Sequence, residues 1–203
     1  IDGPIIARKP VMAEIRRARN SDDRGRVPMI TAPVILASAS PRRRDLLAQI
    51  GIEPAAIIPA DIDETPHRRE LPAKYALRMA CEKALAVALP SDLPKHSLVL
   101  AGDTVVACGR RILPKAESEA EARLCLGLLS GRRHRVYGGI AVRLPDGQLR
   151  TRVVTSTVIF KRLHPDEIAA YIATNDWQGK AGGYAIQGPA AAYIRHIDGS
   201  YQT

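Results

Sequence analysis

The sequence predicts an α/β fold from two observations. Short apolar segments typical of strands alternate along the chain with longer amphipathic segments that have helical periodicity. Pro residues stand at the first positions of three of the four expected helices, and Gly residues follow several of the helices. The 203 residues, 46% hydrophobic and 25% charged, suffice for one large domain or two small ones with a substantial core.

The expected elements follow one another closely along the chain. Strands are expected at residues 34–37, 55–60, 97–107, 135–144 and 149–162, and helices at about 41–50, 72–89, 117–129 and from 165 onward. The last two strands form a hairpin, because residues 145–148 (Pro-Asp-Gly-Gln) favour a tight turn. In the helix over 117–129, periodicity places Ala120, Leu124 and Leu128 on one inward face. In the helix over 72–89, the apolar stripe leaves Lys83 on the surface.

Charge and composition exclude some classes of protein. The formal net charge of +9 suggests an anionic ligand, and aromatic residues at 4% are too scarce for a platform that stacks single strands. Residues 1–32 hold seven basic against four acidic residues without a clean period. We expect them to be a basic, non-catalytic extension that precedes a domain over 33–203.

The three cysteines, Cys81, Cys108 and Cys125, match neither a disulfide framework nor a zinc pattern. They are expected to be core thiols in a reducing compartment, and a cytoplasmic location follows from this. No apolar run approaches the ~20 residues that a membrane-spanning helix needs, so no membrane partner is expected.

The end of the first strand carries the densest group of polar side chains. Ser38 and Ser40 end the apolar run, Ser40 is a good N-cap, and Pro41 suits the first helical position. Arg42 and Arg43 then lie in the first helical turn, where the helix already carries partial positive charge. Hydroxyls, free backbone N–H groups and arginines together predict a phosphate site. A solvated basic helix end is the alternative.

Carboxylates occur at two places in or next to expected strands. Asp61, Asp63 and Glu64 come directly after the second strand, where they form either a magnesium site or a surface acidic loop. Asp103 interrupts the most buried strand, and an ionised carboxylate there needs a cation or a metal. The alternative is an Asp at a bulge that accepts hydrogen bonds from backbone N–H groups. Asp103 is therefore the strongest catalytic candidate.

Two further segments are candidates for ligand contact. Lys115 precedes the third helix and either reaches a ligand or is solvated. Residues 177–188 contain several glycines together with Lys180 and Gln187, so the backbone can approach a ligand closely. A merely flexible loop is the alternative, but Trp177 and Tyr184 favour a packed one.

The order and spacing of several short motifs are more specific than any one of them. These motifs are Ser38-Ala39-Ser40-Pro41-Arg42-Arg43, Asp63-Glu64, Glu82-Lys83-Ala84, Asp103-Thr104, Lys115, Leu129-Ser130-Gly131 with His134, and Lys180-Ala181-Gly182-Gly183-Tyr184-Ala185-Ile186-Gln187-Gly188. Together they resemble the Maf family of nucleoside triphosphate pyrophosphatases from about residue 33 to the end of the chain.

The resemblance implies a fold and a reaction. The fold is mixed α/β, with an elongated, bent β-sheet flanked by helices and two lobes around a central cleft, similar to the inosine triphosphate pyrophosphatases. The reaction cleaves a nucleoside triphosphate between its α- and β-phosphates and releases pyrophosphate. A divalent metal is implied, Mg²⁺ first and Mn²⁺ as the alternative, and a homodimer is left open.

The resemblance also implies roles for individual residues. Asp103 matches the general base, and Glu64 matches a carboxylate that binds the metal together with Asp103. The matches to positions that handle phosphates or specificity are Ser38, Arg42, Arg43, Lys83 and Lys115, and those that select the base are Thr104 and Gln187. We count Lys83 with the catalytic group.

Three of the matched residues indicate a branch of the family. Arg42, Thr104 and Gln187 together resemble the branch that acts on dTTP and UTP, with 7-methyl-GTP as the alternative substrate. A nucleic-acid-binding or septum-inhibiting protein without catalysis is the alternative from another class. Family members usually continue past Gly199-Ser200-Tyr201, so we expect the C-terminal tail to be shortened here.

Overall fold

The structure, a computed structural model, describes residues 32–201, so the extension expected over 1–32 lies almost wholly outside the described residues. The strands are β1 (Val34–Leu36), β2 (Ala56–Ile57), β3 (Leu98–Cys108), β4 (Arg111–Leu113), β5 (Arg133–Arg143), β6 (Leu149–Phe160) and β7 (Ile194–Asp198). The helices are α2 (Pro41–Gln49), α3 (Pro72–Ala86), α4 (Glu119–Leu129), α5 (Pro165–Ala173) and the short 3₁₀ helix η1 (Pro189–Tyr193). The expected α/β class is confirmed.

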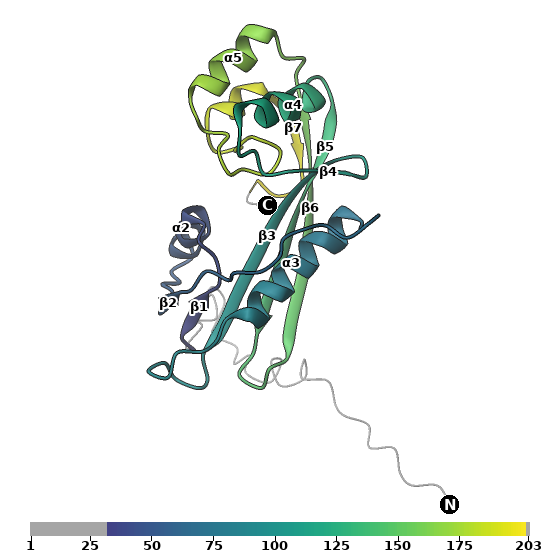
Figure 1. Cartoon of the computed structure of the whole chain (residues 1–203). Helices are drawn as coiled ribbons and strands as arrows, with labels where there is room; N and C mark the ends of the chain where they lie inside the picture. The colour runs from purple at the N-terminus through teal and green to yellow at the C-terminus, as the bar shows by residue number, and fades with distance from the viewer. Residues whose placement is uncertain (1–31, 202–203) are drawn as a thin grey trace, which may run out of the picture. The chain divides into compact units, whose positions relative to one another are not determined.

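One mixed sheet connects these strands in the order β2-β1-β3-β5-β6-β7, with β4 paired to β3. β1 pairs in parallel with β2 and β3, whereas β3, β5, β6 and β7 pair in antiparallel fashion. The long strands β3, β5 and β6 run from the part that carries α2, β1 and β2 to the part that carries α4 and α5 (Figure 1). Both parts are therefore built on the same β-sheet.

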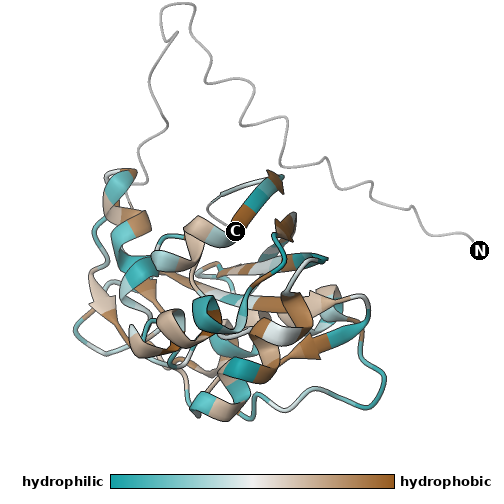
Figure 2. Cartoon of the chain, turned by 90° about the horizontal axis from the view of Figure 1, so that it is seen from above, coloured by the Kyte–Doolittle hydropathy of each residue, from teal (hydrophilic) through white to brown (hydrophobic). Residues whose placement is uncertain are grey.

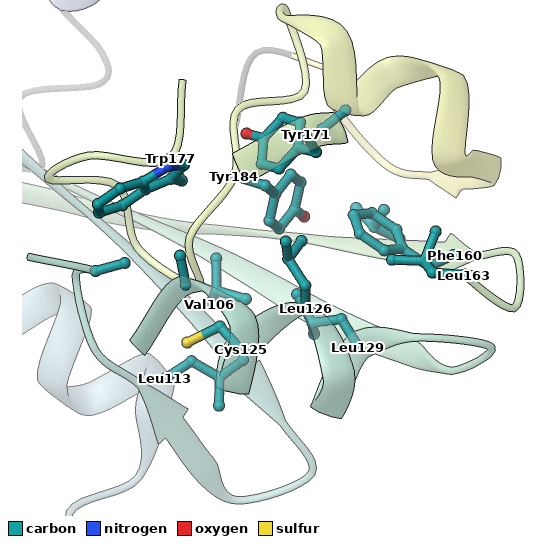
Figure 3. Packing of buried hydrophobic residues seen from close by; sticks show 14 of the residues in the cluster. Val106, Leu113, Cys125, Leu126, Leu129, Phe160, Leu163, Tyr171, Trp177 and Tyr184 are labelled. Carbon is teal, nitrogen blue, oxygen red and sulfur yellow. The ribbon is translucent and has the colours of Figure 1, made fainter. Parts of the chain in front are cut away.

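Separate apolar clusters stabilise the two parts. In one, α3 packs on β1, β3 and β5 through residues that include Ile35, Ala80 and Val99. In the other, α4 and α5 pack on the far ends of β3, β5 and β6, and Figure 3 shows its aromatic and aliphatic side chains together. Figure 2 shows hydrophilic and hydrophobic residues on the same helices, as amphipathic elements on a sheet require. The segment Gly102–Thr104 of β3 lies between the two clusters.

The close approach of α3 to the sheet depends on Gly139 of β5, which pairs with Asp103 of β3. A Cβ at Gly139 would lie 2.1 Å from the backbone oxygen of Ala76 in α3, so any side chain there would displace the helix. The same helix carries Lys83, and the packing therefore sets how closely Lys83 approaches β3.

Some helix faces differ from the expected ones. In α4 the buried residues are Ala122, Cys125, Leu126 and Leu129, and Leu128 of the expected face is half-buried against the same cluster. Ala120 is exposed and Leu124 is 55% exposed, so the expected inward face was wrong for these two residues. In α3, Lys83 is buried, which overturns its expected surface position. The second strand also covers only two residues, and α3 ends at Ala86.

Cys125 is buried and the other two cysteines are half-buried, and all three are free thiols. The expected core position therefore holds for Cys125. Within residues 32–201, no helix combines the length and apolar character that a membrane crossing needs.

Candidate active site

A cavity of about 500 Å³ lies beside β3, and residues of both faces of this strand line it. Leu100, Gly102, Thr104 and Val106 belong to one face, whereas Asp103 belongs to the face that packs against α3, and Lys83 of α3 also lines the cavity. Seven predicted site residues line the cavity: Arg42, Arg43, Lys83, Asp103, Thr104, Lys115 and Gln187. The other two predicted residues, Ser38 and Glu64, are not part of the lining, but each is bonded to a lining side chain. The structure thus brings all nine together.

Arg43 spans the end of β1 and the middle of β3. Its guanidinium donates to Ser38 Oγ at 2.8 Å and to Thr104 Oγ1 at 3.4 Å. Ser38 is buried and also accepts from the backbone N–H of Ser40 at 3.2 Å. Ser40 holds the N-cap position of α2, but its side chain makes no capping hydrogen bond. Ser38 therefore orders the strand-to-helix turn and orients Arg43.

Arg42 reaches across the cavity to the glycine-rich loop. Its Nη1 donates to Gln187 Oε1 at 3.3 Å, although 145 residues separate the two in sequence. Neither Arg42 nor Arg43 forms an ion pair with a carboxylate among residues 32–201. Both cations are therefore held by neutral partners and lie at a cavity wall.

On the other side of the cavity, four charges alternate in sign. Lys83 Nζ lies 2.7 Å from Asp103 Oδ1 and 2.8 Å from Glu64 Oε1. The other oxygen of Glu64, Oε2, accepts a hydrogen bond from Lys115 Nζ. Asp103 and Lys83 are buried, and Lys115 is exposed, so the chain of charges runs from the interior to solvent. A bond to Lys83, rather than a bulge, accounts for the Asp inside an apolar strand.

Two further contacts support Glu64 and Lys115 within this chain of charges. The hydroxyl of Tyr75 in α3 donates to the backbone oxygen of Glu64 at 2.5 Å. Lys115 forms an isolated antiparallel bridge with Ala181, and the N–H of Gly182 donates to Pro114 at 2.9 Å. The loop predicted to be packed is packed, and it supports Lys115.

The electrostatics differ between the two sides. Burial opposes ionisation of Glu64, but the hydrogen bonds and charges of Lys115 and Lys83 outweigh it and lower the pKa of this carboxyl. Burial lowers the pKa of Arg43, with Arg42 adding to the effect and Asp103 opposing it. Burial and the nearby carboxylates raise the pKa of Tyr75 to about 12, so this hydroxyl stays a donor at neutral pH.

The acidic segment after β2 contributes one carboxylate to the site. Asp61 is exposed, and Asp63 Oδ1 accepts from the backbone N–H of Thr65 at 2.9 Å, so the magnesium site expected from three neighbouring carboxylates is not formed by them. Over residues 32–201, no group of three or more His, Cys, Asp or Glu side chains could hold a metal ion. Asp103 lines the cavity, and Lys83 joins Asp103 to Glu64.

Two features of the site had no role assigned from sequence. His134 on β5 is buried, and its Nε2 lies 2.6 Å from the hydroxyl of Tyr184 in the loop. Burial lowers the pKa of His134 to about 4, so the ring is neutral near pH 7. At the other end of the chain, Ser200 and Tyr201 line the cavity. His134 stood in the matched motifs, whereas nothing local marked the fold-back of residues 199–201.

Fold and cavity together define a mixed α/β protein with a cavity lined by arginines, lysines and a buried carboxylate. A family model described as Maf-like protein matches residues 33–203, and the chain belongs to this family. It is 62% identical over 172 residues to a dTTP/UTP pyrophosphatase of Paramagnetospirillum magneticum, covering 84% of this chain and 88% of the relative. It is 59% identical over 184 residues to a dTTP/UTP pyrophosphatase of Rhodospirillum rubrum, covering 90% of this chain and 85% of the relative.

Among solved structures, a HAM1 protein from Coxiella burnetii is similar at a TM-score of 0.44 and 16% identity. That similarity covers 65% of this chain and 74% of the HAM1 chain.

Proposed function

We propose that the protein hydrolyses dTTP and UTP to the nucleoside monophosphate and pyrophosphate, with residues 33–203 as the catalytic domain. One observation is the main support for this proposal. Two arginines without carboxylate partners among the described residues face the same cavity as a buried carboxylate that a lysine holds in place. A polyanion matches the arginines, and the carboxylate matches a water that must lose a proton.

The phosphates bind along the arginine side. Arg42 and Arg43 have N–H donors beyond those used on Gln187 and Ser38, and these bind phosphate oxygens in charge-assisted hydrogen bonds. Lys115, exposed at the mouth of the cavity, binds the outer phosphates. Ser38 and Thr104 keep Arg43 in position.

Asp103 acts as the general base. Lys83 binds its Oδ1 and fixes the carboxylate, so Oδ2 is the oxygen that accepts the proton of the attacking water. Oxygen of that water bonds to the α-phosphorus, the bond from phosphorus to the bridging oxygen breaks, and pyrophosphate leaves. The hydroxyl of Thr104 in the lining accepts a hydrogen bond from Arg43, a cation that cannot take its proton, which favours direct attack by water.

A magnesium ion fits this donor set when it arrives with the triphosphate. Mg²⁺ is typically bound by one or two carboxylates plus substrate phosphates and water rather than by a protein cage. Glu64 and Asp103 supply the two carboxylates. When bound, the ion neutralises phosphate charge and polarises a phosphate oxygen. Mn²⁺ suits the same oxygen ligands.

The base is selected by the amide of Gln187. Because Arg42 donates to its Oε1, the Nε2 group is left to donate toward the cavity. Uracil and thymine carry a carbonyl at C4 that accepts such a bond, whereas cytosine carries an amino group there. A site that pairs with one base edge rejects a mismatched edge strongly, because its own polar group is left unpaired.

Other aspects of the proposal rest on simpler grounds. Three free thiols are compatible with the cytoplasm. A homodimer and a role in septum formation stay predictions.

Pyrophosphate release from dTTP, UTP, CTP, GTP, ATP and 7-methyl-GTP, with Mg²⁺ or Mn²⁺, tests the function. We expect dTTP and UTP to have the highest kcat/KM. Preference for 7-methyl-GTP would overturn the base assignment alone, and release from no nucleotide would overturn the enzyme. In the second case, salt-dependent binding to DNA would support the nucleic-acid alternative.

A further inference from the structure

The last described residues of the chain are fastened to the cavity wall. Ser156 Oγ on β6 donates to the backbone oxygen of Ser200 and accepts from its N–H, both at 2.9 Å. Gly199 allows this approach, since its φ is +119° and a Cβ there would lie 2.8 Å from Ser156 Oγ. The backbone thus delivers Tyr201 to the cavity in a defined position.

Tyr201 is an accessible aromatic ring beside the residue that reads the base. It lines the cavity at 46% exposure, and its hydroxyl donates weakly to the backbone oxygen of Ile186 at 3.4 Å. Ile186 directly precedes Gln187. The other aromatic side chain in the described lining, Tyr184, is 6% exposed and its hydroxyl is bonded to His134. Of the two aromatic side chains in the described lining, Tyr201 is therefore the one that is accessible to a ligand.

We propose that Tyr201 stacks on the face of the pyrimidine whose edge Gln187 binds. The inference rests on the proposed function for the identity of the ligand. Every nucleobase has a π-face, so stacking adds affinity for bases in general, whereas hydrogen bonds to the edge discriminate among them. Tyr201 then supplies affinity and Gln187 supplies selectivity.

Binding of a dUTP analogue with a non-hydrolysable α,β-bridge tests this division, with inorganic tripolyphosphate as the probe that lacks a base. Calorimetry on the full chain compares the native protein with Tyr201→Ala and Tyr201→Phe. Leu124→Ala, an exposed apolar residue of α4 outside the cavity lining, is the matched control.

We expect Tyr201→Ala to raise the Kd of the analogue about ten- to hundredfold and to leave the Kd of tripolyphosphate within about twofold. Tyr201→Phe keeps the ring and should stay within about threefold of the native Kd. The kcat/KM ratio of UTP to CTP should not change in Tyr201→Ala, because that ratio reports on the base edge.

The stacking role is overturned if Tyr201→Ala binds the analogue like the native chain, if both probes weaken equally, or if the native chain does not bind the analogue. If the native chain binds the analogue but releases no pyrophosphate from dTTP or UTP, the proposed reaction fails. The comparison of Kd values then still decides the role of Tyr201.

Discussion

The two sides of the cavity hold their charges in opposite ways. On the lysine side, Lys83 joins two carboxylates, and the charges of Asp103, Lys83, Glu64 and Lys115 compensate one another within the protein. On the arginine side, Arg43 bonds to hydroxyls and Arg42 to an amide, so neither positive charge is compensated by a described carboxylate in direct contact.

This difference separates residues that the fold needs from residues that the ligand needs. Removing one member of a buried ion pair leaves an unpaired charge in the interior, which destabilises the folded state strongly. Removing a cation that lacks a charged partner costs little, and relieves repulsion between Arg42 and Arg43 at a helix N-terminus. Catalysis and stability should therefore respond differently on the two sides.

The largest expected effect is on turnover. Asp103→Asn should lower kcat by about 10²- to 10⁴-fold, because an amide cannot accept the proton of water. The melting temperature should change little, since the new Oδ1 still accepts from Lys83 and Glu64 remains as the charged partner of Lys83. Steady-state kinetics with UTP and thermal unfolding measure the two quantities, and nearly normal turnover would refute the role of general base.

The lysine side should be the side that stability depends on. Lys83→Met leaves Asp103 buried without its cation and should lower the free energy of unfolding by about 3–5 kcal/mol. Lys115→Met is the matched control, because Lys115 is exposed and surface ion pairs contribute at most about 1 kcal/mol. Urea denaturation compares the two variants. Equal losses would show that the buried pair is not the stabilising element.

The arginine side should be the side that binding depends on. Arg42→Ala and Arg43→Ala should each weaken binding of tripolyphosphate about ten- to hundredfold, in keeping with the ~1.5–3 kcal/mol of a charged hydrogen bond. The free energy of unfolding should hold or rise. Arg44→Ala on the same helix is the control, since Arg44 is exposed and pairs with Asp45 at 3.6 Å. Lost stability with retained binding would make the arginines structural.

A smaller effect is expected where the arginine side meets the base. Gln187→Glu removes the Nε2 donor and adds a negative charge, so the kcat/KM for dTTP and UTP should fall about tenfold or more. Binding of tripolyphosphate should be retained within about threefold. Measurement of both separates base recognition from phosphate binding, and a parallel loss of the two would contradict the assignment.

The smallest expected effect is the loss of stability at acidic pH. Because the pKa of Glu64 is lowered in the folded state, the unfolded state binds more protons as the pH falls below about 4.5. The stability from Glu64 is thus present above that pH and is lost as the pH falls through the folded-state pKa. Glu64→Gln should be less stable than the native chain at pH 6, and the difference should shrink as the pH is lowered below about 4.5. A pH-independent difference in denaturant unfolding would contradict this.

The turn from β1 to α2 could be predicted because its signals are local. Strand residues, Ser40, Pro41 and the following arginines act within one stretch of chain, and the structure places α2 where these residues predict it. The membership of Asp103 in the site was also predictable, because a carboxylate in an apolar strand demands a partner wherever the strand packs.

What local periodicity could not decide was which side of a helix faces the sheet. Lys83 belongs to a helix with apolar residues on more than one face, and Asp103 on β3 is what makes burial of a lysine favourable. Leu124 is apolar yet exposed, because α4 turns Cys125 and Leu126 inward. In both helices the partner surface, not the helix, sets the buried face.

By itself, the sequence determined the order of β1, β2, β3, β5 and β6 and of the four α-helices, the residues that match the Maf-like family, and the chemical types gathered at the site, but not β4, η1 and β7. The tertiary structure alone decided that Lys83 joins Asp103 to Glu64, that Arg42 meets Gln187, and that Tyr201 returns to the cavity. Each of these contacts joins residues at least 15 positions apart in the sequence. Local preferences act within a turn or a strand, whereas such contacts form only when the whole sheet brings distant segments together.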